Sequence, residues 1–505
     1  AEETYTDNVR LSPRGAERSD WVTTLRPAFT LSTSGPRLRA DLRYAPQLIY
    51  RKNEDTHDVF NYLQGYASAE VLNELLFLDA QAYSSRQNAS LLGPQAESDV
   101  NRTSNRTSVH AYSISPFLRR TFARDITAEV RYSHNVVKYG ASNLSSSEAD
   151  RVDAVLTSGS PYNLTSGSAQ GLTSGAAYSP TGIPAYNVGS GLAYKAFTWN
   201  VAYFKDHIRY TETHQSVDME RINAGAHRRI TANVGILASV GYERNDYLTV
   251  GPPPSGKFWS VGPEWTPTPR THLAATIGRR FFGPTRTLDF SHRTRLTTWT
   301  LTYDEDLTTG RGQVLVPVSF DTASYLDTLL LPRIPEPGPR QTAVQSLIAQ
   351  TGLPAQLSAP VNYVTTVPFV QKRLRAAFGI NGVRNTVLIH AFRQTRDTNA
   401  GSVAIGAGSG DLALSPRIVQ TGGGVLWSLR ISPATTSNAS IDVARNEFPS
   451  IDREDTLTTF RIALVKQFQP RVSGTVEFRH LQNHSNQGAA SYRENAVMAG
   501  IRLSF

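Results

Sequence analysis

The sequence predicts an all-β fold: a single antiparallel β-barrel that crosses a bacterial outer membrane with about 22 strands, within a range of roughly 18 to 24. Three observations support this prediction. Apolar and polar residues alternate with a period of two, short and long links alternate along the chain, and an apolar strand ends in a terminal Phe. All of residues 1–505 are predicted to form this one barrel.

Composition excludes several other classes of protein. The chain has no Cys, which excludes disulfides, thiolate zinc sites and iron–sulfur clusters. It has no run of about 18 apolar residues that would indicate a transmembrane helix. Aromatic residues make up 9% and charged residues 18%, a balance that does not fit a disordered chain. Residues 1–3 carry no basic and apolar signal segment, so we expect a mature terminus left by signal cleavage.

The first long alternating segment covers residues 37–51. Apolar and aromatic residues occupy the even positions from Leu38 to Tyr50, and mostly charged or polar residues lie between them. The segment is long enough to cross a membrane as a tilted strand. The same alternation recurs further along the chain, at residues 232–243, 259–266, 419–431 and 472–479.

The links between the strands are of two kinds. Tight links are predicted near residues 34–36, 73–75, 124–125, 194–196, 229–231, 267–270, 294–296, 381–384, 432–435 and 469–471. Longer polar links lie between them, and the longest are predicted at 140–183 and 309–360. Outer-membrane barrels have short periplasmic turns and long extracellular loops, so the alternation favours this class. Ten tight links join about 20 strands, and one strand at each end gives about 22.

The last strand of the chain has an apolar stripe that begins at Val497. Ile501, Leu503 and Phe505 end this stripe and are predicted to be the C-terminal signal that the barrel insertion machinery recognises.

One face of the strands is polar and predominantly basic, and we expect it to line the lumen. The predicted lumen-lining residues are Arg37, Arg39, Asp41, Arg43, Glu129, Arg131, Glu243, Arg280, Arg373, Arg375, Arg430, Arg461, Glu477, Arg479 and Arg502. A cationic wall concentrates anionic solutes, which predicts passage of an acidic polymer or of small anions. The alternative is that these charges pair across neighbouring strands and only keep the lumen wet.

A barrel of this size has a lumen wide enough for a channel or a plug. Strand patterning begins by about Trp21, so we expect no N-terminal plug domain. The links 140–183 and 309–360 are then either surface loops or segments that fold inward and constrict the pore.

We expect no catalytic residues, cofactor or metal, no nucleic-acid partner and no enzymatic activity. Residues 251–257 superficially match a phosphate-binding loop, but three prolines fill its middle and Phe258 replaces the required Ser or Thr. His480 and His484 share a strand face about 13 Å apart, which is too far for one metal ion.

Several segments resemble a family of bacterial outer-membrane β-barrel proteins encoded in exopolysaccharide gene clusters linked to the PEP-CTERM sorting system. The similar segments are Tyr5–Asn8 with Leu11 and Pro13, Asp41–Tyr44, Leu75–Ala80, Phe282–Pro284, and Leu288–Arg295 with Trp299 and Tyr303. The resemblance implies export of an exopolysaccharide through the barrel, in partnership with a periplasmic polysaccharide export protein.

Outer-membrane lipid and lipopolysaccharide are further expected partners of such a barrel. Three alternatives remain open: a general diffusion porin for small, preferentially anionic solutes, a sheath around a cytochrome, and a structural barrel whose loops bind the surface polymer.

Overall fold

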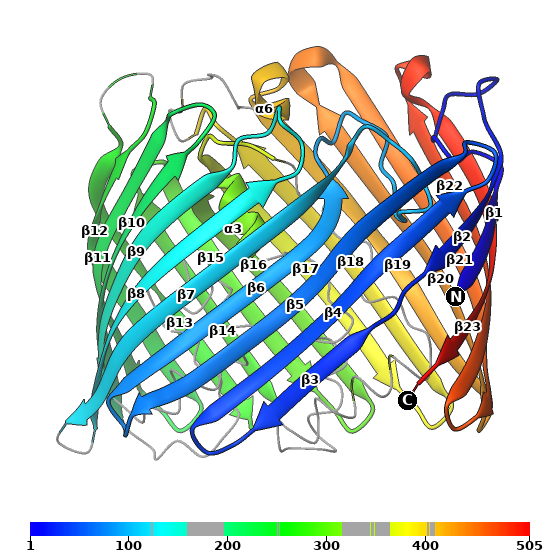
Figure 1. The fold of residues 1–505 in the computed structure, drawn as a ribbon. Coiled ribbons are helices and arrows are strands. Elements are labelled where there is room, and N and C mark those ends of the chain that lie inside the picture. Colours follow the sequence, from blue (N-terminus) through cyan, green and yellow to red (C-terminus); the bar gives the residue numbers. More distant parts are fainter. Residues whose placement is uncertain are drawn as a thin grey trace.

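The computed structural model describes residues 1–122, 125–158, 196–249, 251, 253–315, 344, 348, 364–400, 403 and 410–504. These residues form a closed antiparallel barrel (Figure 1). Strands β2 (Asp20–Leu25) and β3 (Phe29–Ser34) both pair with β4 (Leu38–Arg51), at successive heights. The 23 strand segments therefore fill 23 − 1 = 22 positions in the wall, which confirms the predicted fold class and strand number.

The remaining strands follow in chain order, each antiparallel to its neighbours. They are β1 (Glu2–Thr6), β5 (Thr56–Leu72), β6 (Leu76–Asn88), β7 (Arg106–Phe122), β8 (Ile126–Tyr139), β9 (Ser147–Ser158), β10 (Phe197–Tyr210), β11 (Ser216–Arg229), β12 (Val234–Asp246), β13 (Ser255–Thr268), β14 (Thr271–Arg280), β15 (Gly283–Arg293), β16 (Thr297–Thr308), β17 (Phe369–Asn381), β18 (Asn385–Asp397), β19 (Arg417–Ser432), β20 (Thr435–Phe448), β21 (Arg453–Gln469), β22 (Val472–Ser485) and β23 (Tyr492–Leu503).

Helical segments are short. They are α3 (Gly310–Leu315), α6 (Asp411–Leu414), η2 (Pro449–Ile451) and η3 (Gly488–Ala490). Across the described ranges, no helix is long and apolar enough to span a membrane.

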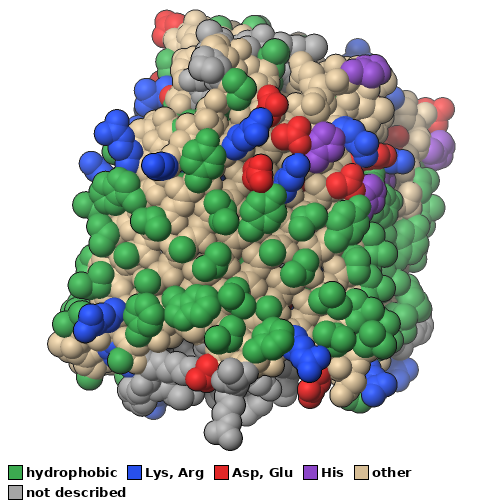
Figure 2. All heavy atoms as spheres, turned by 90° about the vertical axis from the view of Figure 1, so that its left-hand side faces the viewer, with side chains coloured by type: hydrophobic (Ala, Val, Ile, Leu, Met, Phe, Trp, Pro, Cys, Tyr) green, Lys and Arg blue, Asp and Glu red, His purple; other side chains and the backbone are tan. Residues whose placement is uncertain are grey.

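Alternation along each strand separates an outward apolar face from an inward polar face. On β8, Val130 and Tyr132 are 50% and 43% exposed, whereas Glu129 and Arg131 between them are 6% and 9% exposed. The outward apolar side chains together form an apolar belt around the barrel (Figure 2). Where the inward side chains contact one another or the loops, as on β8, the polar face is the buried one, the reverse of a water-soluble fold.

The two ends of the barrel differ. At one end, here called the turn end, most strands are joined by short turns such as residues 73–75 and 433–434. At the other end, here called the loop end, longer links such as residues 89–105 and 309–368 join them. This arrangement agrees with the predicted alternation of links, with the turn end on the periplasmic side.

The predicted long loop at 140–183 is wrong over residues 147–158. These residues form β9, which pairs with β8 and β10, so the link at the loop end is only residues 140–146. The strand carries Ser, Asp and Arg at several positions and therefore resembles a polar link in composition. Residues 159–183 lie outside the described residues, as does most of the tight link predicted at 194–196.

The barrel closes through the short strand β1. This strand pairs with β2 on one side and β23 on the other, through residues Glu2 to Thr6. Strand β3 pairs with β4 and, in the part of the chain that the structure describes, with no second strand. The pairing across this closure therefore lies in the half of the wall nearer the loop end, where Figure 1 places β1.

Candidate functional site

The segment between β6 and β7 turns into the barrel and lies against its inner wall. Residues 89–105 are here called the inner loop. On one side, Arg51 at the end of β4 donates from Nε to the Val100 carbonyl at 3.0 Å. On the other side, Asn101 Nδ2 donates to Glu494 Oε1 on β23 at 2.6 Å. The loop-end opening of the barrel is here called the mouth. Arg51 and Glu494 are 1% and 0% exposed, so both anchors lie in its packed interior.

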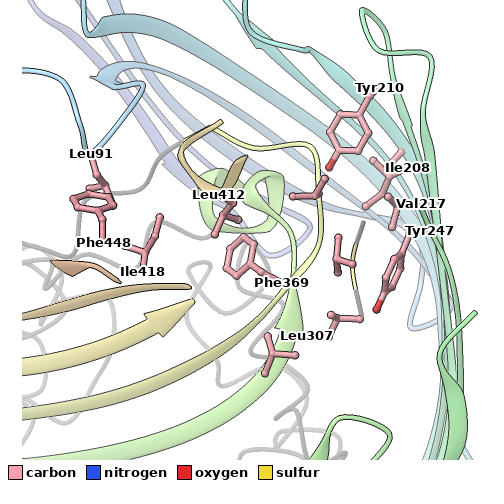
Figure 3. Packing of buried hydrophobic residues seen from close by; sticks show 14 residues of the cluster. Leu91, Ile208, Tyr210, Val217, Tyr247, Leu307, Phe369, Leu412, Ile418 and Phe448 are labelled. Atoms are coloured by element: carbon pink, nitrogen blue, oxygen red, sulfur yellow. The ribbon is translucent and has the colours of Figure 1, made fainter. Parts of the chain in front are cut away.

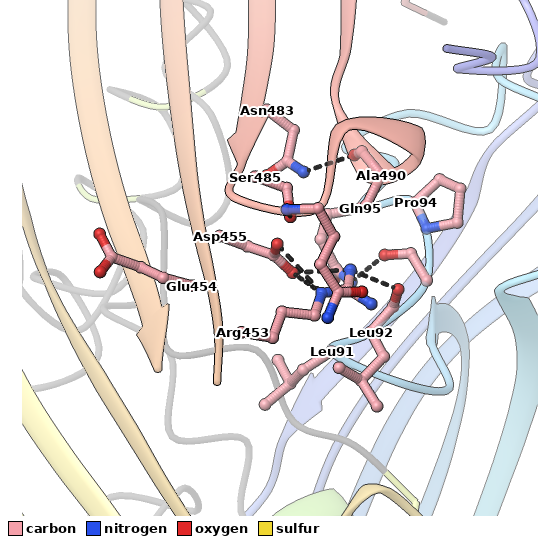
Figure 4. Close-up of polar contacts among 12 residues, drawn as sticks. Leu91, Leu92, Pro94, Gln95, Arg453, Glu454, Asp455, Asn483, Ser485 and Ala490 are labelled. Carbon is pink, nitrogen blue, oxygen red and sulfur yellow. Dashed lines mark hydrogen bonds and ion pairs between the residues drawn. The ribbon is translucent and has the colours of Figure 1, made fainter. Parts of the chain in front are cut away.

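The inner loop is also bound to β21 and β23 (Figure 4). Arg453 Nη2 donates to the Leu92 carbonyl at 2.9 Å and forms an ion pair with Asp455 at 2.8 Å. The backbone N–H of Gln95 donates to the Tyr492 hydroxyl at 2.8 Å. These contacts join residues more than 350 positions apart in the chain, so they form only when the barrel closes.

Helix α6 docks on the start of the inner loop. Asp411 accepts hydrogen bonds at 2.6 Å from Ser90 Oγ and from the backbone N–H of Leu91. Burial raises the pKa of the Asp411 carboxyl above its ordinary value of 3.8, although these two hydrogen bonds act in the opposite direction. The docked arrangement therefore favours protonated Asp411 more strongly than a solvent-exposed Asp does.

Both described ends of the link between β16 and β17 also lie inside the mouth. The buried side chain of Arg311 in α3 donates to Ser147 Oγ at 3.4 Å, and burial lowers the pKa of its guanidinium. The Val364 N–H donates to the Ala89 carbonyl at 3.1 Å, which joins this link to the inner loop. Of the predicted loop 309–360, residues 316–360 lie outside the described residues except Val344 and Ile348.

An apolar cluster joins these inward segments to the wall (Figure 3). Leu91 of the inner loop, Leu412 of α6 and Phe369 of β17 belong to it, together with Ile418 and Phe448. Each of these five side chains is at most 1% exposed. Burial of a large apolar side chain contributes about 1.5–3 kcal/mol, so the cluster supplies substantial free energy for docking the loops inside the mouth.

Alternation along the strands places the predicted lumen-lining residues on the inward face, except Arg37, which lies in the turn before β4. By strand, the inward residues are Arg39, Asp41 and Arg43 on β4, Glu129 and Arg131 on β8, Glu243 on β12, Arg280 on β14, Arg373 and Arg375 on β17, Arg430 on β19, Arg461 on β21, Glu477 and Arg479 on β22, and Arg502 on β23.

Many of these charges form ion pairs with acids on strands one or two positions away in the wall. The pairs are Arg131 with Asp79 at 2.7 Å, Arg280 with Glu243 at 2.6 Å, Arg373 with Asp304 at 2.8 Å, Arg461 with Glu477 at 3.2 Å, and Arg479 with Glu494 at 3.1 Å. These residues therefore follow the alternative given above, in which the inward charges pair with one another. The pairing lowers the net positive charge of that part of the lumen.

A second group of arginines has no ion-pair partner among the described residues. Arg39, Arg43 and Arg430 are exposed to the lumen and form no ion pair with any residue in the described ranges. Arg39 lies near the start of β4 and Arg430 near the end of β19, so both are close to the turn end. Asp41 lies between Arg39 and Arg43 on the same face of β4, and the three arginines still outnumber it in the turn-end half of the described lumen.

The C-terminal strand carries two of the predicted signal residues on its outward face. Ile501 and Leu503 are 59% and 58% exposed, and Phe505 lies outside the described residues. Recognition of these residues by the insertion machinery stays a prediction.

The sequence pattern near residues 86–106 predicts only a longer polar link, and it does not predict the role of residues 89–105 in the mouth. The available signal was the pair Leu91-Leu92 with Val100, which are apolar residues in an otherwise polar segment. Leu91 and Val100 are 1% and 5% exposed, as expected for apolar positions that pack against a partner.

Comparison with protein-family models and with curated proteins finds no match. Among solved structures, the chain is similar to the siderophore receptor PirA from Pseudomonas aeruginosa, with 10% identity and a TM-score of 0.44 over 99% of this chain and 80% of that chain. It is also similar to BauA, the ferric preacinetobactin receptor from Acinetobacter baumannii, with 9% identity and a TM-score of 0.44 over 99% and 79% of the two chains. These similarities concern the barrel fold.

The fold itself defines the class of protein. A closed barrel of 22 antiparallel strands with an apolar outer belt and a polar interior is an outer-membrane β-barrel of the size that transporters use. The protein is therefore located in the outer membrane of a Gram-negative bacterium, where its belt contacts lipid and, in the outer leaflet, lipopolysaccharide.

Docking of α6 on the inner loop should depend on pH. Because the pKa of Asp411 is raised in the docked state, docking is strongest below pH 3.8 and weakens as pH rises from there to the raised pKa. The native chain has no Cys, so spin labels can be attached at cysteines introduced at Leu92 and Leu414, and the distance between them, measured by electron paramagnetic resonance, would give the docked fraction across this range. In Asp411→Asn the fraction should lose this pH dependence, and an unchanged profile would contradict the role of Asp411.

Proposed function

We propose that the barrel is a non-enzymatic conduit that passes an acidic exopolysaccharide to the cell surface and is held closed at the loop end by the inner loop. The observation that carries this proposal is the docking of residues 89–105 inside a polar lumen through hydrogen bonds, ion pairs and apolar contacts. None of these contacts is covalent, so a conformational change is sufficient to release the loop. A hydrated polymer needs a wide polar path, which suits a barrel of this size.

The acidic character of the polymer is inferred from the turn-end arginines. Arg39, Arg43 and Arg430 would attract an anionic chain as it enters from the periplasm. The resemblance to barrels of exopolysaccharide gene clusters supports the same substrate class. It also supports a periplasmic polysaccharide export protein as the partner that delivers the polymer to the turn end.

The second candidate function is diffusion of small anions. The same three arginines support it, because a positive entrance selects small anions as well as acidic polymers. The two functions differ in what blocks the pore: a polymer conduit admits polymer ends into the lumen, whereas a small-solute porin excludes them.

Polymer block of an opened pore distinguishes the two functions. In planar bilayers, a variant whose inner loop is replaced by a short Gly-Ser link should be blocked by polygalacturonate added at the turn end, and far less by neutral dextran of equal length. Arg39→Gln with Arg43→Gln should weaken this block and reduce anion selectivity by about several-fold, since two of the entrance charges are removed.

The matched control is Lys466→Gln, which removes an outward-facing charge near the same end and should change neither property. Equal block by both polymers, or by neither, would argue against an acidic-polymer conduit and leave small-anion diffusion.

A further inference from the structure

Basic and aliphatic side chains lie together on short turns at the turn end, which is the lower end of the barrel in Figure 1. Three successive links, at residues 269–270, 294–296 and 382–384, join β13 to β14, β15 to β16 and β17 to β18. Their sequences are Pro-Arg, Thr-Arg-Leu and Gly-Val-Arg, without Asp or Glu. These three links are here called the basic rim, and their arginines are Arg270, Arg295 and Arg384.

The charge of the rim arginines is not neutralised by neighbouring acids. All three side chains are exposed, and none forms an ion pair with a residue of the described ranges. Arg37 and Arg471 lie on two further links of this end, whereas the β5–β6 and β7–β8 links carry Glu74 and Asp125. The basic rim is therefore positive and available to an external acidic group.

Two outward Trp residues mark the membrane interface above the rim. Trp265 and Trp299 are 47% and 44% exposed, and outer-membrane barrels have aromatic girdles at the interface. Arg270 lies five residues after Trp265, and Arg295 lies four residues before Trp299. At about 3.3 Å per residue along strands tilted by about 40°, the rim projects roughly 10 Å beyond this girdle. The rim arginines therefore face the periplasm and not the lipid headgroups.

Hydrogen bonds within the turns hold the rim in one shape. The backbone N–H of Thr294 donates to the Thr297 carbonyl at 2.8 Å, and the hydroxyls of these two residues are also 2.8 Å apart. The backbone N–H of Gly382 donates to the Asn385 carbonyl at 2.8 Å. Because these turns are already ordered, a partner that binds them loses little conformational entropy on binding.

Exposed aliphatic side chains distinguish the rim from a purely electrostatic entrance. Val383 and Leu296 are 85% and 39% exposed, and each is adjacent in sequence to a rim arginine. Ile230 on the neighbouring β11–β12 link is 56% exposed and extends this row. An acidic polysaccharide gains little from aliphatic contacts, whereas protein interfaces combine apolar contacts with arginine. The combination favours a protein as the partner of the rim.

The size of the rim also suits a protein. Successive links are two strand positions apart, which is about 10 Å, so Arg270 and Arg384 are roughly 20 Å apart along the rim. A standard interface of about 800 Å² on each partner is roughly 30 Å across. One protein surface can therefore contact all three links at once.

We propose that the basic rim is the docking surface for a periplasmic protein that presents an acidic face. The rim arginines pair with its carboxylates, and Leu296 and Val383 contact apolar side chains between them. Complementary charge steers this partner to the turn end and excludes basic proteins. The surface is inferred from its own charge and shape, and only the identity of the partner as a polysaccharide export protein rests on the proposed function.

Photo-crosslinking of the full chain in living cells tests this docking. The photoreactive residue p-benzoylphenylalanine in place of Val383 should form an adduct with a periplasmic protein. The same residue in place of Asn73, beside Glu74 on an acidic link, should not. Arg295→Glu with Arg384→Glu should lower the adduct yield at position 383 by about tenfold or more, because like charges then face each other.

The matched control is Arg37→Glu with Arg471→Glu, which makes the same change of charge on two turns outside the rim and should leave the yield unchanged. Mass spectrometry identifies the crosslinked partner, and its purified form should bind the barrel more weakly as salt concentration rises. The heat-dependent shift in electrophoretic mobility that folded barrels show confirms that each variant is folded.

Three outcomes would overturn the proposal. The first is an adduct with lipid alone, or no adduct, at position 383. The second is an unchanged yield after reversal of the two rim charges, and the third is an equal loss in the control variant. A rim-dependent adduct with a protein other than a polysaccharide export protein would support the docking surface and contradict the partner named in the proposed function. The polymer-block experiment tests the conduit separately.

Discussion

The barrel should conduct ions in large, long-lived steps once the inner loop is replaced by a short Gly-Ser link. In the intact protein, residues 89–105 fold into the mouth, where they are held by Arg51, Arg453 and Glu494, and we expect them to reduce the conductance to little or none. Removing the loop takes away both the obstruction and one component of the apolar cluster, so it also weakens the packing of α6. Single-channel recording in planar bilayers measures the difference.

The control for this experiment is a variant in which the link at residues 449–452 is replaced by a Gly-Ser link in the same way. This link also lies at the loop end, and the replacement keeps Ile451, which packs partly against the apolar cluster, so the variant should remain as silent as the intact protein. If the inner-loop variant folds and stays silent, the obstruction must come instead from the link between β16 and β17, and our assignment of the closing element would be wrong.

Arg51→Met should destabilise the protein by about 3 kcal/mol. The Arg51 guanidinium is 1% exposed and donates to the carbonyl oxygens of Asp99 and Val100, besides its ion pair with Asp58. Methionine fills similar space but leaves two buried carbonyl groups without donors, at roughly 1–3 kcal/mol each. Denaturant unfolding of the reconstituted barrel, followed by Trp fluorescence, measures this loss.

Arg102→Gln tests whether the effect comes from burial. Arg102 pairs with Glu54 at 3.0 Å at the same end of the barrel, but its side chain is 48% exposed. Glu54 keeps its second ion pair, with Arg10, so loss of the exposed Arg102 should cost at most about 1 kcal/mol and this variant should unfold nearly as the unaltered protein does. Similar losses in the two variants would mean that Arg51 acts only as a surface charge.

The local pattern was sufficient to predict much of the wall. Whether a residue faces lipid or lumen depends on its position within its own strand, because neighbouring residues point to opposite faces. Glu129 and Arg131, for example, lie on the predicted inward side of β8, between the exposed Val130 and Tyr132. The same local rule failed at β9, because Ser and charged residues on both faces hide its period of two.

The contacts at the site required the tertiary structure. Asn101 and Glu494 are separated by 393 positions, and barrel closure alone brings them within 2.6 Å. Strand register likewise decides that Arg131 meets Asp79 while Arg39 meets no acid within the described ranges. Sequence alone therefore determined the barrel, its apolar belt and its polar interior, since these depend on neighbours within one strand. The docking of residues 89–105 inside the mouth and the neutralised charges of the lumen depend on which distant strands lie side by side, and only the folded barrel decides that.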